Sequence, residues 1–388
     1  MELKTGYKKT EVGVIPDDWD DKALHEICGM KSGLGIKTSG IDNFSLYPCF
    51  GGNGLRGYAN SFTHDGNYAL IGRQGALCGN VLEVSGRFFA SEHAIVVRSK
   101  LQTDISWLTF LLAKMNLNQY SESSAQPGLS VEKILKLRIP TPPNRHEQTA
   151  IANALSDTDA LIRSLQKLIE KKRQIKQGTM QTLLNPYENG VLRTGWKIVK
   201  LGEVCDVKDG THQTPKYVDS GIPFYSVESV TRNDFVNTKF ISHEEHKFLT
   251  KNFRIEKGDV LMTRIGSIGD CKYVDWAVDA SFYVSLALLK VKDQLSAKFL
   301  AHYSTSAYFK KEIELNSLQH AIPKKINLGQ ISEIKIGIPT DISQQLNLAS
   351  LLSDMEAEIA ALESKLTKYQ QIKQGMMQNL LTGRIRLV

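Results

Sequence analysis

Residues 148–184, QTAIANALSDTDALIRSLQKLIEKKRQIKQGTMQTLL, recur at residues 345–381 as QLNLASLLSDMEAEIAALESKLTKYQQIKQGMMQNLL. The two stretches align without a gap at a constant offset of 197, and 18 of their 37 positions are identical. A match of this length is not a chance event, so the chain contains an internal duplication. We therefore expect two similar halves, each ending in the same kind of element.

Both copies are predicted to be long helices. Each follows a proline and opens with a capping-box pair, Asn144 with Glu147 in the first copy and Asp341 with Gln344 in the second. Apolar residues recur at four- and three-residue spacing in both copies, at Ile151, Leu155, Ile162, Leu165 and Ile169, and at Leu348, Leu352, Met355, Ile359, Leu362 and Leu366. This stripe predicts a coiled coil rather than a helix laid against a globular core.

The stripe is interrupted at the same place in both copies. Lys176 and Lys373 occupy slots that should be apolar, and Gly178 and Gly375 follow two residues later. A glycine inside a helix costs about 1 kcal/mol relative to alanine, so its presence in both copies favours close approach by another helix over shared ancestry alone. The predicted partner-binding residues are Lys176, Gly178, Met180, Lys373, Gly375 and Met377.

The segments that precede the two helices repeat more faintly. Trp19 and Cys28 reappear as Trp196 and Cys205 at an offset of 177, while Arg73-x-Gly75 reappears as Arg264-x-Gly266. Short apolar strands are predicted at 68–71, 94–98, 260–263 and 285–291, with helices near 106–120 and 297–316. Each segment is therefore an α+β module. The predicted boundaries are 1–143 for the first module, 144–185 for the first long helix, 186–340 for the second module, 341–382 for the second long helix and 383–388 for a tail.

The composition sets broad limits. The 388 residues carry a formal net charge of +7, which permits a polyanionic partner without requiring one. Five cysteines without a C-x-x-C pair fit a reducing cytoplasm. We find no apolar run long enough for a membrane span and no apolar leader at the start, so we expect a cytoplasmic protein.

Catalytic motifs are weak throughout. Residues 50–54, FGGNG, fit the F-x-G-x-G pattern of S-adenosylmethionine sites, but turn residues follow where a helix should begin. Residues 185–187, NPY, lack one proline of the adenine methyltransferase motif, and the acidic residues at 17–21 are too close together for a nuclease metal site. Residues 243–246, HEEH, lack zinc-site spacing. We predict no catalytic residues, no metal and no cofactor.

Basic, polar and aromatic residues instead gather on the predicted turns. Arginine and lysine can read guanine edges, glutamine can read adenine, and hydroxyl groups hold phosphates. For Arg73 and Arg264, each after an apolar strand and before a glycine, a DNA-facing role and a structural salt bridge both stay open. The candidate DNA-binding residues are Lys37, Arg56, Arg73, Gln74, Ser91 and His93 in the first module, and Lys208, Thr211, His212, Lys216, Arg232, Arg264, Ser281 and Tyr283 in the second.

Several motifs together resemble the specificity subunit of type I restriction–modification enzymes. They are Gly13-Val14-Ile15-Pro16-x-x-Trp19, the two Arg-x-Gly turns, the loop at residues 209–215 (DGTHQTP), the Pro-x-x-x-x-Gln helix openings and residues 373–383 (KQGMMQNLLTG). The resemblance implies two mixed α/β target recognition domains joined by the long helices as an antiparallel coiled coil with pseudo-two-fold symmetry. It also implies that the chain reads an asymmetric bipartite target on double-stranded DNA, and that two methyltransferase (M) subunits and restriction (R) subunits bind it.

Two other functions remain open at this stage. One is a self-sufficient S-adenosylmethionine-dependent DNA methyltransferase built around residues 50–54. The other is a coiled-coil adaptor whose modules bind proteins.

Overall fold

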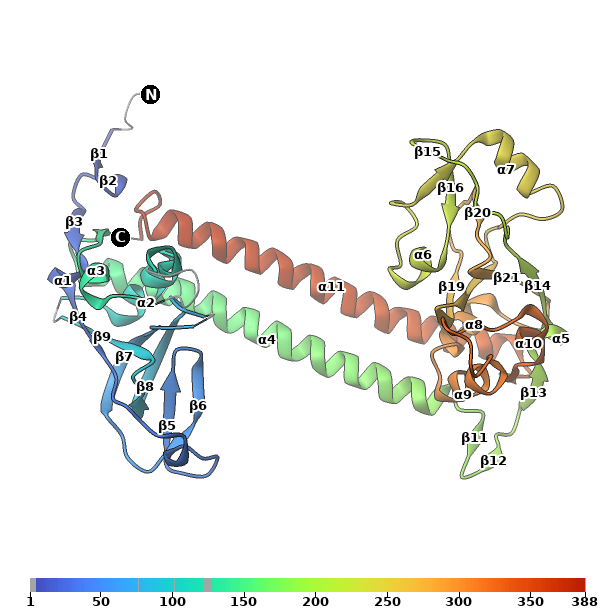
Figure 1. Cartoon of the computed structure of the whole chain (residues 1–388), viewed down its shortest axis with the longest axis horizontal. Coiled ribbons are helices and arrows are strands. Elements are labelled where there is room, and N and C mark those ends of the chain that lie inside the picture. The colour runs from blue at the N-terminus through green and yellow to red at the C-terminus, as the bar shows by residue number, and fades with distance from the viewer. Residues whose placement is uncertain (1–4, 76, 101, 122–127, 388) are drawn as a thin grey trace. The chain divides into compact units, whose positions relative to one another are not determined.

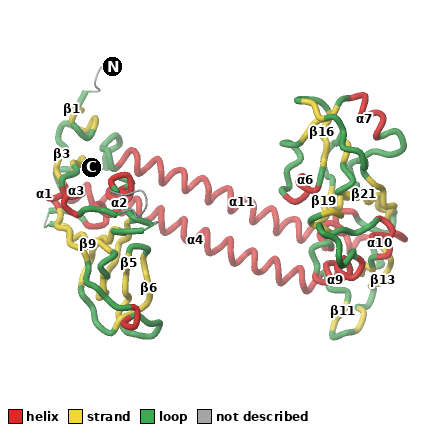
Figure 2. Tube along the Cα trace, viewed as in Figure 1, coloured by secondary structure: helices red, strands yellow, loops and turns green. Residues whose placement is uncertain are grey.

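The computed structural model describes residues 5–75, 77–100, 102–121 and 128–387 (Figure 1). It divides into two compact units, unit 1 with residues 1–167 and 363–388, and unit 2 with residues 168–362. The long helices α4 (Arg145–Leu183) and α11 (Ile342–Leu380), of 39 residues each, both continue from one unit into the other. Each unit thus combines one globular module with part of both long helices, and strands occur only in the modules among the described residues (Figure 2).

Module 1 is built on one large sheet. Its strands are β1 (Tyr7–Thr10), β2 (Gly13–Pro16), β3 (Asp20–Ala23), β4 (Cys28–Ser32), β5 (Tyr47–Gly51), β6 (Gly54–Ala59), β7 (His64–Gly72), β8 (Val81–Ala90), β9 (Ala94–Ser99) and β10 (Arg138–Thr141). Its helical segments are α1 (Leu24–Ile27), η1 (Thr38–Gly40), α2 (Ile105–Lys114), η2 (Leu117–Tyr120) and α3 (Val131–Leu135). Six strands pair in the order β4-β9-β7-β8-β5-β6, while β1 pairs with β2 and β10 with β3.

Module 2 repeats this plan with a divided sheet. Its strands are β11 (Tyr187–Glu188), β12 (Val191–Leu192), β13 (Trp196–Lys200), β14 (Cys205–Asp209), β15 (Tyr217–Val218), β16 (Ile222–Tyr225), β17 (Lys239–Ile241), β18 (Val260–Ile265), β19 (Ser267–Tyr273), β20 (Ser281–Phe282), β21 (Leu286–Val291) and β22 (Lys335–Pro339). Its helices are α5 (Leu201–Val204), α6 (Val227–Thr231), α7 (His243–Leu249), α8 (Ala297–Tyr303), α9 (Ala307–Asn316) and α10 (Leu328–Glu333). The order β14-β21-β18-β19 matches β4-β9-β7-β8, and β15-β17-β16-β20 forms a second sheet. The predicted α+β modules are confirmed.

Each module closes its main core with the long helices. In unit 1 the fully buried Trp19 and Trp107 pack with Ile151 and Leu155 of α4 and with Leu381, which follows α11. In unit 2 Phe299 and Tyr303 of α8 pack with Leu352 of α11 and Leu184, just after α4. Each module therefore rests on the start of one long helix and the end of the other, because both bury apolar side chains in the same cluster.

The long helices run antiparallel within each unit. In unit 2, the ammonium groups of Lys172 and Lys176 lie 2.6 Å from carboxylate oxygens of Glu358 and Glu356 respectively. Residue numbers therefore increase along α4 in the direction in which they decrease along α11. The predicted stripe is buried along α4 at Ile151, Leu155, Ile162, Leu165 and Ile169. Within the described part of the chain, no helix is both long enough and apolar enough to span a membrane.

A buried glutamine joins each module to the first turn of its helix. Gln148 Oε1 accepts the amide of Asp104 (2.9 Å), and its Nε2 donates to the carbonyl of Pro142 (3.3 Å). At the equivalent position, Gln345 Oε1 accepts a hydrogen bond from the amide of Ser296 (2.8 Å). Its Nε2 donates to the carbonyls of Gln294 (3.0 Å) and Pro339 (2.9 Å). Asp104 and Ser296 cap α2 and α8, so the glutamine fixes the position of the module helix on the long helix.

The predicted capping boxes are only half right. Asn144 Oδ1 does accept the amides of His146 and Glu147, at 2.6 and 3.3 Å. The Glu147 carboxylate instead accepts the indole N–H of Trp19 (3.2 Å) and binds the guanidinium of Arg386 (2.9 Å). A carboxylate that is almost fully buried needs such partners, and they come from the two ends of the sequence.

Replacing Gln345 tests how much its hydrogen bonds between module 2 and α11 contribute to stability. Gln345→Leu keeps the side-chain size but leaves the amide of Ser296 and the carbonyls of Gln294 and Pro339 without partners. Since an unpaired buried polar group costs about 1–3 kcal/mol, we expect urea unfolding to show a loss of roughly 2–3 kcal/mol. The exposed neighbour gives the control, because Gln344→Leu should change stability by less than about 0.5 kcal/mol. Equal effects at both positions would contradict this role.

Candidate nucleic-acid interface

Loops of module 1 meet at one end of its sheet. The amide of Arg73 donates to the carbonyl of His93 (2.9 Å). A Cβ atom on Gly52, in the turn between β5 and β6, would lie 3.0 Å from the carbonyl oxygen of His93 and 3.1 Å from that of Gln74. The turn therefore packs closely on both other loops, and the carboxylate of Glu92 brings in a fourth loop by accepting the amide of Ile36 (3.3 Å).

This end, which we call edge 1, holds the predicted residues Lys37, Arg56, Arg73, Gln74, Ser91 and His93. Lys37, Arg56 and Gln74 are exposed, and Arg73 and His93 are half-buried. Ser91 differs, because it is fully buried and its Oγ has no hydrogen-bond partner among the described residues. Ser91 therefore lies beneath the loops instead of presenting its hydroxyl group to a ligand.

The corresponding end of module 2, edge 2, is organised around the loop that follows β14. The amide of Thr211 donates to the carbonyl of Phe282 (3.1 Å), and the amide of Val284 donates back to Thr211 (3.0 Å). The predicted residues at or beside this junction are Lys208, Thr211, His212, Lys216, Arg264, Ser281 and Tyr283. Arg232 is separated from it, because α6 meets the junction at Val227 and Arg232 follows the other end of that helix.

The sequence left open whether Arg264 faces DNA or forms a structural salt bridge, and in this structure it forms the salt bridge. Its side chain is 4% exposed, and its guanidinium lies 2.5 Å from Asp209 Oδ1 and donates to the carbonyl of Ile326 (3.3 Å). His212 Nε2 lies 2.7 Å from the other oxygen of Asp209. Arg264 thus holds the loop through Asp209, and the prediction that it faces DNA is not what this structure presents.

Ser281 is also directed inward. It is 3% exposed, and its hydroxyl lies 2.9 Å from Nδ1 of His246, whose Nε2 lies 2.9 Å from Asp279. These contacts join β20 to α7. The exposed side chains of edge 2 are consequently those of His212, Lys216 and their neighbours, with Lys208 and Tyr283 half-buried.

A further loop of edge 2 was missed from the sequence. The carbonyl of Lys324 accepts the amide of Gly266 (2.8 Å), and Lys325 forms an isolated β-bridge with Ile265. The loop also carries His320 and Ile322, the latter 99% exposed. Its basic, proline-containing composition (residues 319–325, QHAIPKK) was the available signal, but the sequence alone did not place it beside Arg264.

The lysines that interrupt the helix stripe form ion pairs between the helices. Lys176 Nζ lies 2.6 Å from Glu356 in unit 2, and Lys373 Nζ lies 2.6 Å from Asp159 in unit 1. Positions 159 and 356 are equivalent at the repeat offset of 197, so the same pair forms twice. The lysines therefore have an intramolecular role, which the partner-binding prediction did not include.

The surroundings of the two pairs differ. Lys373 also lies over the ring of Phe110 (5.6 Å), whereas Glu356 lies 3.8 Å from Nδ1 of His302, the residue at the matching place on α8. Burial lowers the pKa of His302, and the nearby Glu356 carboxylate opposes that shift.

No close helix approach occurs at the helical glycines within the described chain. A Cβ atom added to Gly178 or to Gly375 would meet no described atom within 4 Å. The predicted close approach by another helix is therefore not made by the chain's own described helices, and binding of another protein at these positions stays a prediction. Met180 and Met377 are half-buried and pack against the cores of their own units.

The fold and the two edges define a class of protein: a duplicated binding module carried by paired long helices, with the same frame and different loops in each copy. The chain matches the family model described as the type I restriction modification DNA specificity domain twice, over residues 16–176 and 193–374, and it belongs to this family.

Relatives and solved structures agree with the family. The chain is 44% identical to the Type I restriction enzyme EcoprrI specificity subunit of Escherichia coli over 155 residues, 39% of the chain and 38% of that subunit. It is 24% identical to the MjaVIII specificity subunit of Methanocaldococcus jannaschii, over 96% of the chain and 94% of that protein. The fold resembles the crystal structure of a type I restriction-modification S subunit from M. genitalium, with a TM-score of 0.67, 18% identity and 98% of each chain covered. A chain from a study of type I R-M complex assembly is similar with a TM-score of 0.54 and 17% identity, over 96% of this chain and 99% of that one.

Experiments should distinguish the buried residues that hold the loop of edge 2 from the exposed residues that are available to DNA. Arg264→Ala leaves the partly buried Asp209 without its cation, so chemical denaturation should show a loss of about 1–3 kcal/mol. Lys216→Ala removes an exposed charge and should change stability by less than about 0.5 kcal/mol, while weakening DNA binding and reducing its salt dependence. Unchanged stability with Arg264→Ala would refute the loop-holding role.

The helix ion pair can be tested by charge reversal in unit 1. Lys373→Glu and Asp159→Lys should each destabilise the chain, because each places like charges face to face between the helices. The combined variant should recover stability, with a coupling free energy of about 0.5–1 kcal/mol from a double-mutant cycle. Additive effects would mean that the two side chains do not interact in solution.

Proposed function

We propose that the chain is the DNA sequence-specificity subunit of a type I restriction–modification complex, and that each module reads one half of an asymmetric bipartite target. The observation that carries this proposal is the double match to the specificity domain, combined with two edges that share a frame and differ in their exposed side chains. Different side chains favour different bases, so the two half-sites should differ in sequence.

The chemistry of the edges supports a duplex DNA ligand. Edge 1 exposes Lys37, Arg56 and Gln74, and edge 2 exposes His212 and Lys216 on the loop that Arg264 holds. Lysine and arginine contact phosphates or guanine, and glutamine can pair with adenine through two hydrogen bonds. Buried side chains beneath each edge keep the loops in place, which limits the entropy lost when DNA binds.

The long helices are the proposed surface for the methyltransferase and restriction subunits. Ile175 and Ile372 occupy equivalent positions in the repeat, and both are exposed, at 46% and 41%. Gly178 and Gly375 lie one turn further along, with open space above their Cα atoms. We therefore propose that partner subunits bind here, that the chain itself contributes no catalytic residue or cofactor, and that it acts in the cytoplasm on genomic DNA.

The alternative of a self-sufficient methyltransferase loses its main support. Gly51–Gly54 forms the turn of the β5–β6 hairpin, whereas a cofactor-binding glycine loop requires a strand followed by the start of a helix. Measuring DNA affinity at several salt concentrations tests the adaptor alternative. A module that binds only proteins should show no DNA affinity that falls steeply as the salt concentration rises.

Mapping methylated adenines tests the proposed function directly. Co-expression with a cognate methyltransferase subunit should methylate one split motif with a fixed spacer, and replacing the exposed residues of edge 1 should change one half of that motif only. A continuous motif, or methylation that does not depend on this chain, would refute the proposal. Calorimetry of the chain alone with S-adenosylmethionine is the control for the methyltransferase alternative and should show no binding.

A further inference from the structure

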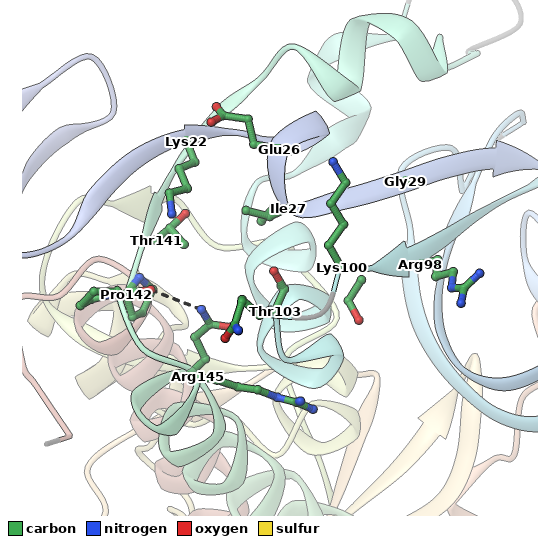
Figure 3. Close-up of a pocket in the computed structure, with 14 residues that line it drawn as sticks. Lys22, Glu26, Ile27, Gly29, Arg98, Lys100, Thr103, Thr141, Pro142 and Arg145 are labelled. Carbon is green, nitrogen blue, oxygen red and sulfur yellow. Dashed lines mark hydrogen bonds between the residues drawn. The ribbon is translucent and has the colours of Figure 1, made fainter.

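A large cavity lies in module 1 away from edge 1. It has a volume of about 920 Å³ and opens between β3, the end of β9 and the first turn of α4 (Figure 3). Its lining includes Gly29 and Arg98, which face each other at one end of the β4–β9 ladder, while Ser32 and Ile95 pair at the end toward edge 1. The cavity therefore belongs to the opposite end of the ladder from the proposed DNA-reading loops.

The lining is strongly basic. Lys22, Arg98, Lys100 and Arg145 contribute four cationic side chains, and Glu26 is the acidic member of the lining. The Glu26 carboxylate is already engaged, because it accepts the amide of Ala23 (2.7 Å). Neither Arg98 nor Arg145 forms an ion pair with another described residue, whereas Lys22 lies 3.1 Å from Asp20. Uncompensated positive charge around a cavity attracts anions.

Hydrogen-bonding groups and an apolar floor complete the cavity. Thr103 and Thr141 line it and are 5% and 3% exposed, so their positions are fixed by packing. Figure 3 shows the Lys22 side chain extending toward Thr141, with Thr103 nearby and Arg145 leaving the first turn of α4. Pro142 contributes apolar surface beside them. Such a combination of a few polar groups with apolar walls, in a cavity of several hundred Å³, is typical of small-molecule sites.

Module 2 has the same backbone arrangement but lacks most of the polar residues that line the cavity. At the matching positions Lys22 is replaced by Val199, Thr103 by Leu295, Thr141 by Ile338, Arg145 by Ile342 and Gly29 by Asp206. The lysines that match Arg98 and Lys100 are both neutralised there, Lys290 by Glu256 and Asp259, and Lys292 by Asp206. The fold therefore does not require a basic side chain at positions 22 and 145, or a hydroxyl group at positions 103 and 141.

We propose that this cavity binds a small phosphate-bearing ligand of nucleotide size. Several cations and the hydroxyl group of Thr103 suit the charged, multiply accepting oxygens of a di- or triphosphate, and the volume leaves room for an organic group beyond the phosphates. The site lies at the end of the β4–β9 ladder opposite edge 1, so the proposal stands whether or not the chain reads DNA as proposed.

Gly29 offers a sharp test. A Cβ atom there would meet nothing within 4 Å, so a side chain fits without disturbing the fold. Gly29→Asp places the carboxylate of module 2 beside Arg98, whereas Gly29→Asn adds a side chain of the same size without charge. Calorimetry on the full chain, with inorganic pyrophosphate and with ATP as probes, should show binding to the wild type that Gly29→Asp weakens on the order of tenfold or more and Gly29→Asn leaves nearly unchanged.

Two more variants carry the module 2 residue into module 1. Lys22→Val and Arg145→Ile should each weaken pyrophosphate binding, while Lys136→Val, which removes an exposed lysine outside the cavity, should not. A short nonspecific DNA duplex serves as a competitor that distinguishes the source of the phosphates. Absence of pyrophosphate and ATP binding to the wild type would overturn the proposal, as would DNA binding that Gly29→Asp weakens while neither small probe binds.

Discussion

The buried glutamine at the start of each long helix is the contact on which the rest of the structure depends. Gln148 and Gln345 each satisfy the amide of the residue that caps the module helix, Asp104 or Ser296. A buried amide group must find partners for both its oxygen and its nitrogen, so the module can occupy only one position on the helix that supplies them. Because the loops of each edge are attached to that module, this polar joint fixes where they lie with respect to the helix in the same unit.

The frame was largely predictable from the sequence, since it depends on local periodicity. The long helices, predicted at 144–185 and 341–382, begin and end within three residues of the observed α4 and α11. The ion pairs of Lys176 and Lys373 were not predictable in the same way. In the sequence, a lysine at an apolar position only interrupts the hydrophobic stripe. Its carboxylate partner lies about 180 to 210 residues away, and only the antiparallel pairing of the two helices brings the two side chains together.

The two Arg-x-Gly turns show why site prediction was less successful than fold prediction. Arg73 and Arg264 occupy the same place after equivalent strands, but Arg264 is buried against Asp209, and the position of module 1 that matches Asp209 is Ser32. Without a carboxylate there, Arg73 forms no ion pair with a described residue and remains half-buried at edge 1. One substitution two strands away in the sheet thus decides whether an arginine supports a loop or stays available to a ligand. A motif cannot reveal that difference without the pairing of the strands.

The duplication also separates structural residues from candidate ligand-binding residues without any other sequence. Positions that keep the same contacts in both copies, such as the glutamines and the lysine–carboxylate pairs, serve the frame, because both copies need them to fold. Positions that diverge while the backbone is kept are free of that requirement. The residues of both edges diverge, which fits two half-sites of different sequence. The cavity lining diverges in one direction only, toward uncompensated positive charge in module 1 and toward neutralised charge in module 2. Drift alone gives no reason for several separate positions of one cavity to change together, whereas a shared anionic ligand does.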